Sequence, residues 1–262
     1  MPRSISVIVT TYNRPDALQL VLQALHMQSR LPDEVIIADD GSTQETRDLI
    51  ARMQMEVDYP LRHVWQPDEG FRAAQIRNKA AGAAQSDYLI FLDDDCVMRP
   101  DFVEKHGLLA EKGWFVAVNR VMLNSRLTCQ VLSQQQPIYL WNLKQWFHVY
   151  KKGECNRIIR LARLPIGPLR KLAPRCWQKT INPLGLWRQD FESVNGYNEA
   201  FVGYGYEDHE LVIRLLSSGI RRKSGKFALT VIHLWHPERD RSRLAHNRQL
   251  FLATQRLLSI RP

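Results

Sequence analysis

Apolar and polar residues alternate in two ways along the first 120 positions of this 262-residue chain. Compact apolar runs, typical of strands, lie at 4–10, 34–39, 61–65 and 87–92. The last run is nearly all apolar, as central parallel strands are. Between the runs, apolar residues recur every three or four positions at 15–28, 43–53 and 72–84, which predicts amphipathic helices. Strands alternating with helices predict an α/β fold with a doubly wound, mostly parallel central sheet flanked by helices.

The pattern is lost at about position 122 and returns near 186. Residues 122–180 are rich in basic and aromatic side chains and follow neither period. Beyond them we predict a helix at 207–219, a strand within 226–238 and an amphipathic helix at 241–260. There is no internal repeat and no low-complexity linker, so we expect one compact domain. Its halves are 1–120 and 121–262, the second carrying a basic aromatic insertion at about 137–180.

A polar cluster follows each of the first four predicted strands. The clusters are Thr-Thr-Tyr-Asn-Arg, Asp-Asp-Gly-Ser, Pro-Asp-Glu-Gly and Asp-Asp-Asp-Cys. In open α/β sheets, ligands bind beyond the carboxyl ends of the strands. All four clusters are therefore expected on one rim of the sheet.

Three consecutive carboxylates, Asp93, Asp94 and Asp95, end the fourth strand. In an extended chain alternate side chains share a face, so Asp93 and Asp95 would point one way and Asp94 the other. Two converging carboxylates would normally share a proton unless a divalent cation neutralises them. Oxygen ligands with open positions suit Mg²⁺ or Mn²⁺, which also bind substrate phosphates. The alternative is a solvated acidic turn.

The other rim residues allow two interpretations each. Asp39 and Asp40 belong either to a turn in which Ser42 or Thr43 caps the next helix, or to a pocket where a carboxylate accepts from a nucleobase N–H. Arg77 either reaches an anionic ligand at the rim or forms a surface ion pair.

The second half supplies a candidate base and candidate metal ligands. Glu207 and Asp208 begin a helix, where the helix dipole favours acidic residues; a carboxylate there could also act as general base for a hydroxyl. His233 and His236 lie at a strand end, and two histidines near a suspected metal rim favour a ligand role for one of them. His233 is the residue expected to emerge from the strand, with His236 as the alternative.

Charge and composition point to an anionic partner. The formal net charge is +9, and between 144 and 179 ten Lys or Arg residues face one acidic residue, Glu154. Interleaved Trp and Tyr suit a membrane interface with anionic lipid, and the alternative is a solvated face with a few core aromatics. The chain shows neither a signal peptide nor an apolar run long enough to span a bilayer. Its four cysteines lack CxxC spacing, so we expect reduced thiols in a cytoplasmic protein, peripheral on the inner face of the plasma membrane.

With these motifs in order, the chain resembles family 2 glycosyltransferases of the GT-A fold. The resemblance is carried by "VIVTTYNR", "DDGS", "DEGF" with its "RN" helix, and "FLDDDC". The stretch from "LWRQDFESVNGYNEAF" through "GYGYEDHELVIRL" to the histidines looks like the C-terminal galactosyltransferase-type module of chondroitin-polymerase-like and β-1,4-galactosyltransferase-like enzymes. Together these motifs cover about 4–118 and 182–237; nothing in 122–180 could be aligned.

The resemblance implies an inverting, metal-dependent transfer of a sugar from a nucleotide sugar, with UDP-sugars favoured, to a glycan or lipid-linked acceptor. Residues 1–120 would bind the nucleotide sugar and 121–262 the acceptor, in synthesis of lipopolysaccharide, capsule or another bacterial surface polysaccharide. Mn²⁺ or Mg²⁺ would be held by Asp95 with Asp93 and His233, or His236. Asp208 would be the catalytic base, with Glu207 beside it. The implied donor-binding residues are Thr10, Tyr12, Arg14, Asp39, Asp40, Arg77, Asp93 and Asp94.

Two other classes of protein compete with this interpretation. A basic nucleic-acid-binding protein would fit the net charge, but no nucleic acid is expected because the rim is acidic and no standard motif occurs. A catalytically inactive sugar-nucleotide-binding relative would be expected to lack the DxD motif or the base, and both are present.

Overall fold

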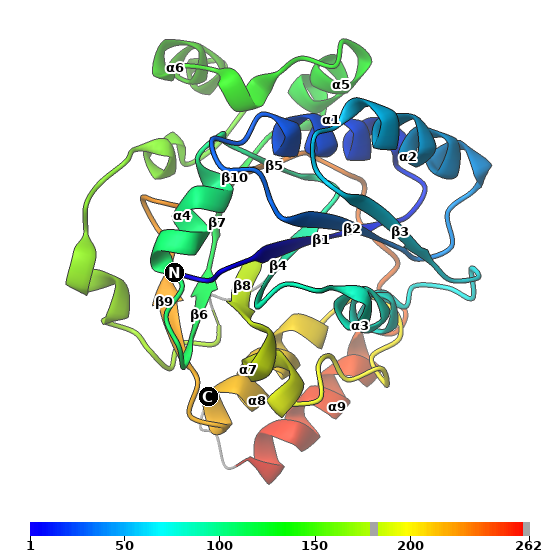
Figure 1. Ribbon diagram of the computed structural model, residues 1–262, viewed down its shortest axis with the longest axis vertical. Helices are drawn as coiled ribbons and strands as arrows, with labels where there is room; N and C mark the ends of the chain where they lie inside the picture. Colours follow the sequence, from blue (N-terminus) through cyan, green and yellow to red (C-terminus); the bar gives the residue numbers. More distant parts are fainter. Residues whose placement is uncertain (179–182, 259–262) are drawn as a thin grey trace.

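The computed structural model describes residues 1–178 and 183–258, and Figure 1 shows a large twisted sheet with helices on both faces. Its seven strands follow the order β3-β2-β1-β4-β8-β6-β9. Their bounds are β1 Ile5–Thr11, β2 Glu34–Asp39, β3 Leu61–Trp65, β4 Tyr88–Asp93, β6 Trp114–Ala117, β8 Leu184–Trp187 and β9 Arg221–Ser224.

The sheet is mostly parallel, as the alternating pattern predicted. β1 pairs in parallel with β2 and β4, and β2 with β3. β8 is the exception, since it runs antiparallel to both β4 and β6. Every residue of β2 and all of β4 except Asp93 are buried, because helices cover both faces.

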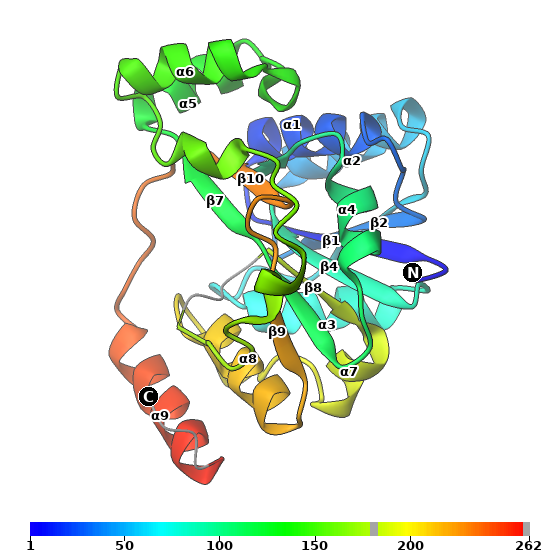
Figure 2. The ribbon, with the colours of Figure 1, turned by 90° about the vertical axis from the view of Figure 1, so that its left-hand side faces the viewer.

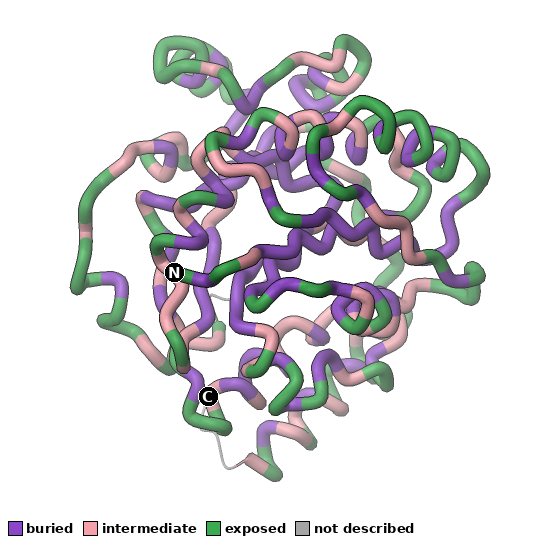
Figure 3. The backbone as a smooth tube through the Cα atoms, in the orientation of Figure 1, coloured by how far each residue is buried: buried purple, intermediate pink, exposed green. Residues whose placement is uncertain are grey.

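Two groups of helices cover the two faces of the sheet. α1 (Pro15–His26) and α2 (Gln44–Glu56) cover one face, and α3 (Ala73–Ala83), α7 (Arg188–Ser193) and α8 (Glu207–Ser217) cover the other (Figure 1). Side chains alternate accordingly along β1: Val7 and Val9 join one core cluster and Ile8 the other. The buried strands form the purple centre of Figure 3. α4 spans Phe102–Leu109, and α9, Leu244–Leu257, packs on α8.

A second, three-stranded sheet, β5-β10-β7, was not expected from the sequence. It consists of β5 Cys96–Met98, β7 Asn119–Met122 and β10 Thr230–His233. β10 is antiparallel to β5, with His233 opposite Cys96, and parallel to β7. The strand expected within 226–238 is thus shorter and belongs to this small sheet.

The stretch at 122–180 contains short helices around two longer ones. These are α5 Ser125–Ser133, α6 Leu143–Lys151 and the 3-10 helices η1 Ile138–Leu140, η2 Ile158–Leu161 and η3 Gly167–Lys171. Figure 2 shows α5 and α6 stacked beyond α1 at one end of the molecule. Within 1–178 and 183–258, no helix has the length and apolar character needed to cross a bilayer.

Candidate active site

Asp95 lies at the junction of the two sheets and meets both histidines. Its carboxylate oxygens are 3.5 Å from Nε2 of His233 and 3.4 Å from Nε2 of His236, and Nη1 of Arg14 is 3.7 Å away. The backbone fixes this meeting, since Leu234 N donates to Asp95 O at 2.8 Å and Cys96 pairs with His233 in the small sheet. Asp95 is only 2% exposed. The structure therefore brings together residues that are far apart in the chain.

This cluster has the chemistry of a metal site. Within the described residues, ligand atoms of Asp95, Cys96 and His233 all lie within 4.8 Å of one another. Nδ1 of His233 is buried and has no hydrogen-bond partner in the part of the chain that the structure describes. Burial lowers the pKa of His233, which favours the neutral imidazole that binds metals. Burial also raises the pKa of the Cys96 thiol, so carboxylate and imidazole are the natural ligands, a set that suits Mn²⁺.

Asp93 and Asp94 have partners of their own. β4 ends at Asp93 and the next two residues form a turn, so the strand alternation expected for the three aspartates does not apply. Asp94 is buried and accepts from Thr11 Oγ1 at 2.7 Å; burial, then the charge of Asp95, raises its pKa to about 7. Asp93 is not part of the cluster around His233.

Arg77 holds Asp93 and connects it with the second half of the chain. Its Nη2 is 2.8 Å from Asp93, and its Nη1 is 3.5 Å from Asp208 and 3.9 Å from Glu207. Burial opposes ionisation of Asp93, but the Arg77 and Arg120 guanidiniums outweigh it and lower the pKa of Asp93 to about 2. Arg77 does form ion pairs with acidic neighbours, but it is only 4% exposed, so these pairs are buried and do not lie on the surface.

Glu207 and Asp208 occupy the first turn of α8. The turn before the helix is left-handed, with φ of 107° at Gly205 and 74° at Tyr206, and Gly205 N donates to Glu207 at 3.1 Å. Tyr197 Oη donates to Asp208 Oδ1 at 3.3 Å. Burial, then the charge of Asp208, raises the pKa of Glu207 to about 7. Glu207 therefore titrates near pH 7, whereas an ordinary carboxyl group is fully ionised there.

A small cavity of about 30 Å³ lies between the ends of β1 and β4. Its lining includes six of the predicted donor-binding residues, namely Thr10, Tyr12, Asp40, Arg77, Asp93 and Asp94. Arg14 and Asp39 are not among the lining residues. Asp39 is 1% exposed and bonds to Ser42 N and His63, so it stabilises the turn after β2.

Three residues at the site carried no prediction. Arg120 on β7 lies 3.4 Å from Asp93. Phe71 and Arg239 line the small cavity, with the Arg239 guanidinium 5.1 Å from the Phe71 ring centre. In the sequence, Phe71 is marked only by its place after Glu69-Gly70, and Arg239 only by its place three positions after His236.

Two family models match the sequence. A model of glycosyl transferase family 2 matches residues 6–156, and a model described as the N-terminal domain of galactosyltransferase matches residues 182–237. Because the first covers more than half of the chain, the chain belongs to glycosyl transferase family 2. The resemblance seen in the motifs is thereby confirmed.

Curated relatives are similar to parts of this chain. Validoxylamine A glucosyltransferase of Streptomyces hygroscopicus subsp. limoneus is 32% identical over 228 residues, which cover 82% of this chain and 48% of that protein. Hyaluronan synthase of Pasteurella multocida is 37% identical over 108 residues, covering 41% of this chain and 11% of that protein. The chain thus spans about half or less of the length of these relatives.

Solved structures share the fold at low sequence identity. TarS 1–349 of S. aureus in complex with UDP-GlcNAc matches with a TM-score of 0.67 and 14% identity, over 98% of this chain and 66% of that one. Mannosyltransferase PcManGT from Pyrobaculum calidifontis, in complex with GDP-Man and Mn²⁺, matches with a TM-score of 0.63 and 18% identity, over all of this chain and 65% of that one. The chain has the GT-A fold that the motifs implied.

Proposed function

We propose that this chain transfers a sugar from a nucleotide-sugar donor to a hydroxyl group of a glycan acceptor, with inversion at the anomeric carbon. The observation that carries the proposal is the convergence of Asp95 with His233 and His236, next to Asp93 held by Arg77, which also contacts Asp208. A metal-binding cluster and a candidate base thus flank one rim.

The donor is assigned to the small cavity and its surroundings. Thr10, Tyr12 and Asp40 would contact the nucleobase, and Asp93 would lie nearer the ribose. Arg77 and Arg239 would contact the diphosphate, for which guanidinium groups are suited. UDP-GlcNAc in one similar structure and GDP-Man in another support a nucleotide sugar, and UDP-sugars are favoured here.

The metal site is assigned to Asp95 with His233, or with His236 as the alternative. Mn²⁺ or Mg²⁺ bound there would offset the negative charge that develops on the departing diphosphate. The imidazole ligand favours Mn²⁺ over Mg²⁺, which prefers oxygen ligands alone.

Asp208 is assigned as the base. It would accept the proton of the acceptor hydroxyl while that oxygen attacks the anomeric carbon from the face opposite the nucleotide. The new bond joins the acceptor oxygen to that carbon; the bond from the carbon to the diphosphate oxygen breaks, and the nucleoside diphosphate leaves with the electron pair. Glu207 would hold the acceptor by hydrogen bonds. Arg77, which contacts both Asp208 and Asp93, would hold these two carboxylates in position.

The substitution Asp208→Asn tests this assignment. The amide cannot take the proton, so sugar transfer should fall by a factor of about 100 to 10,000, while UDP affinity in the presence of Mn²⁺ changes by less than about twofold. Glu192→Gln on α7, an exposed carboxylate away from the rim, is the matched control. Normal turnover by Asp208→Asn would disprove the role of this residue.

The acceptor is proposed to be a growing surface polysaccharide or a lipid-linked glycan at an anionic membrane. The hyaluronan synthase relative supports a polysaccharide product. α6 supports the membrane, since Leu143, Phe147 and Tyr150 are 65%, 49% and 45% exposed, and Lys144 and Lys151 lie beside them. Apolar side chains between lysines are typical of surfaces that bind anionic lipid.

A further inference from the structure

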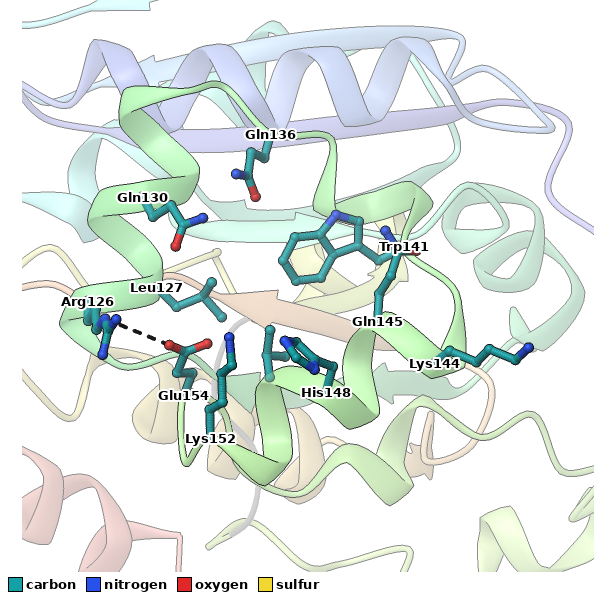
Figure 4. A pocket seen from close by; sticks show the side chains of 11 residues that line it. Arg126, Leu127, Gln130, Gln136, Trp141, Lys144, Gln145, His148, Lys152 and Glu154 are labelled. Atoms are coloured by element: carbon teal, nitrogen blue, oxygen red, sulfur yellow. Dashed lines mark ion pairs between the residues drawn. The ribbon is translucent and has the colours of Figure 1, made fainter.

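A second and much larger cavity lies between α5 and α6, outside the site described above. Its volume is about 460 Å³, within the range of roughly 300 to 1,000 Å³ found for small-molecule sites. Figure 4 shows the Trp141 ring on one side of it, Gln130 and Leu127 on another, and Lys152 and His148 at its base.

The lining combines an aromatic face with amide groups. Trp141 is partly exposed and packs against the buried Trp146, with ring centres 5.1 Å apart, so its orientation is fixed. Three glutamines, Gln130, Gln136 and Gln145, offer hydrogen-bond donors and acceptors around it. A flat ring that packs against C–H groups, surrounded by amides, is suited to the apolar face and hydroxyl groups of a sugar ring.

The charges of the lining are mostly positive. The one carboxylate, Glu154, is buried and lies 3.9 Å from Nε of Arg126. This pair leaves Lys152 to act on a ligand, and its side chain is directed into the cavity in Figure 4. The surplus of positive charge favours a ligand that carries a negative group.

The cavity is tied by hydrogen bonds to the proposed metal ligands. Leu123 N donates to His233 O at 3.0 Å, and the next residue, Asn124, donates from its N to Glu154 O at 2.9 Å. The segment after β10 also contacts α5, because Trp235 N donates to Thr128 Oγ1 at 2.9 Å. The segments that carry His233 and Glu154 are therefore joined through the backbone, and α5 is joined to the segment after β10.

We infer that the α5–α6 cavity binds an anionic saccharide unit of the acceptor, one or more residues away from the hydroxyl that receives the sugar. A ring of this unit packs on Trp141, and its carboxylate or phosphate group meets Lys152. This inference rests on the proposed function for the role of the ligand as acceptor, although binding can be measured without any transfer.

Calorimetric titration of the full chain tests the inference with three probes. These are a hexasaccharide of alternating glucuronate and N-acetylglucosamine, the same hexasaccharide with its carboxyl groups reduced to alcohols, and a hexose 6-phosphate. We expect at least one anionic probe to bind about tenfold or more tightly than the neutral hexasaccharide. Binding of the uronate or of the phosphate probe identifies which anionic group the cavity prefers.

Two neighbouring lysines provide a matched pair of variants. Lys152→Gln removes a charge from the cavity and should weaken binding of the anionic probe by about five- to tenfold. Lys151→Gln removes the same charge one residue earlier, where the amine lies 4.7 Å from the Phe147 ring centre and outside the cavity, and should change binding by less than about twofold. Trp141→Leu removes the aromatic surface on which the sugar ring packs. Once its melting temperature has been shown to be unchanged, this variant should bind the anionic hexasaccharide more weakly than the unmodified protein does.

The outcomes separate this inference from the proposed function. Equal affinity for charged and neutral probes, equal effects of the two lysine variants, or no binding of any probe would overturn the inference. Lys152→Gln should leave hydrolysis of the UDP-sugar donor unchanged. If no donor hydrolysis or transfer occurs while Lys152-dependent binding is present, the proposed function fails and the saccharide site stands.

Discussion

His106, on α4, is a titratable residue that solvent does not reach. It is 0% exposed, with its ring centre 4.6 Å from that of Phe102 and 6.2 Å from that of Tyr88. Neither ring nitrogen has a hydrogen-bond partner within residues 1–178 and 183–258. Burial lowers the pKa of His106 to about 3, so the folded protein keeps this imidazole neutral.

The stability of the fold should consequently decrease in mild acid. Below about pH 6.5 the unfolded chain binds a proton at His106 that the folded chain does not, so stability falls with pH until the folded pKa is reached. His106→Leu should remove on the order of 2 kcal/mol of the loss between pH 6.5 and pH 5. Urea denaturation at both pH values measures this change, with the exposed His246→Leu as control. Equal losses in wild type and His106→Leu would contradict the prediction.

The sequence predicted which residues approach the rim better than it predicted their partners. Asp95 and His233 could be assigned to one metal site because each was predicted at a strand end and the family resemblance paired them. The pairing of Asp93 with Arg77 and Arg120 could not, because it depends on a turn that begins where β4 ends and on a strand, β7, that no pattern indicated. A three-residue carboxylate run carries no signal that distinguishes its members.

Among the elements, α6 has two apolar faces. Trp146 and Val149 pack on the core, while Leu143 and Phe147, one turn apart, point to solvent. Asn142 caps its N-terminus in a capping box with Gln145, which stabilises a helix of only nine residues. The outward face is thus held by a well-anchored helix.

Vesicle co-sedimentation should reveal this face. At low salt, recovery should be greater with anionic vesicles than with neutral ones, and the double substitution Leu143→Ser, Phe147→Ser should reduce binding by about tenfold or more. Met55→Ser on α2, an apolar residue that is 89% exposed, is the control. Equal recovery with both kinds of vesicle, or no effect of the double substitution, would exclude α6 as a membrane contact.

Element length explains which parts of the fold were predictable. Strands of five to seven residues and helices of eleven or more carried a clear period, so β1 to β4 and α1 to α3 were predicted correctly. β5, β7 and β9 have three or four residues, too few to show alternation. The antiparallel placement of β8 depends on its tertiary partners, which no local pattern encodes.

At the scale of the whole molecule, a bound metal and nucleotide would join segments separated by more than a hundred residues. UDP with Mn²⁺ at about 100 times the dissociation constant should stabilise the fold by about 3 kcal/mol and raise the melting temperature by about 5 °C or more. Asp95→Asn should lose the Mn²⁺-dependent part of this increase. Thermal denaturation with and without each component measures it.

The control for this experiment is Asp87→Asn, which changes an exposed carboxylate at the opposite end of β4. That variant should retain the full increase with UDP and Mn²⁺. An increase of the same size with UDP alone would argue against a metal at Asp95.

In the small sheet, the spacing between the proposed metal ligands depends on how the buried side chains of two strands pack together. Asp95 directly precedes β5 and His233 ends β10, so the spacing between them depends on the backbone pairing of these two strands, in which Val97 lies opposite Ile232, both fully buried. Replacing either side chain by a smaller one would alter the preference among metal ions without touching a ligand. Adaptation of this enzyme to a different ion would then begin in its hydrophobic interior, while the proposed nucleotide pocket on the large sheet stays as it is.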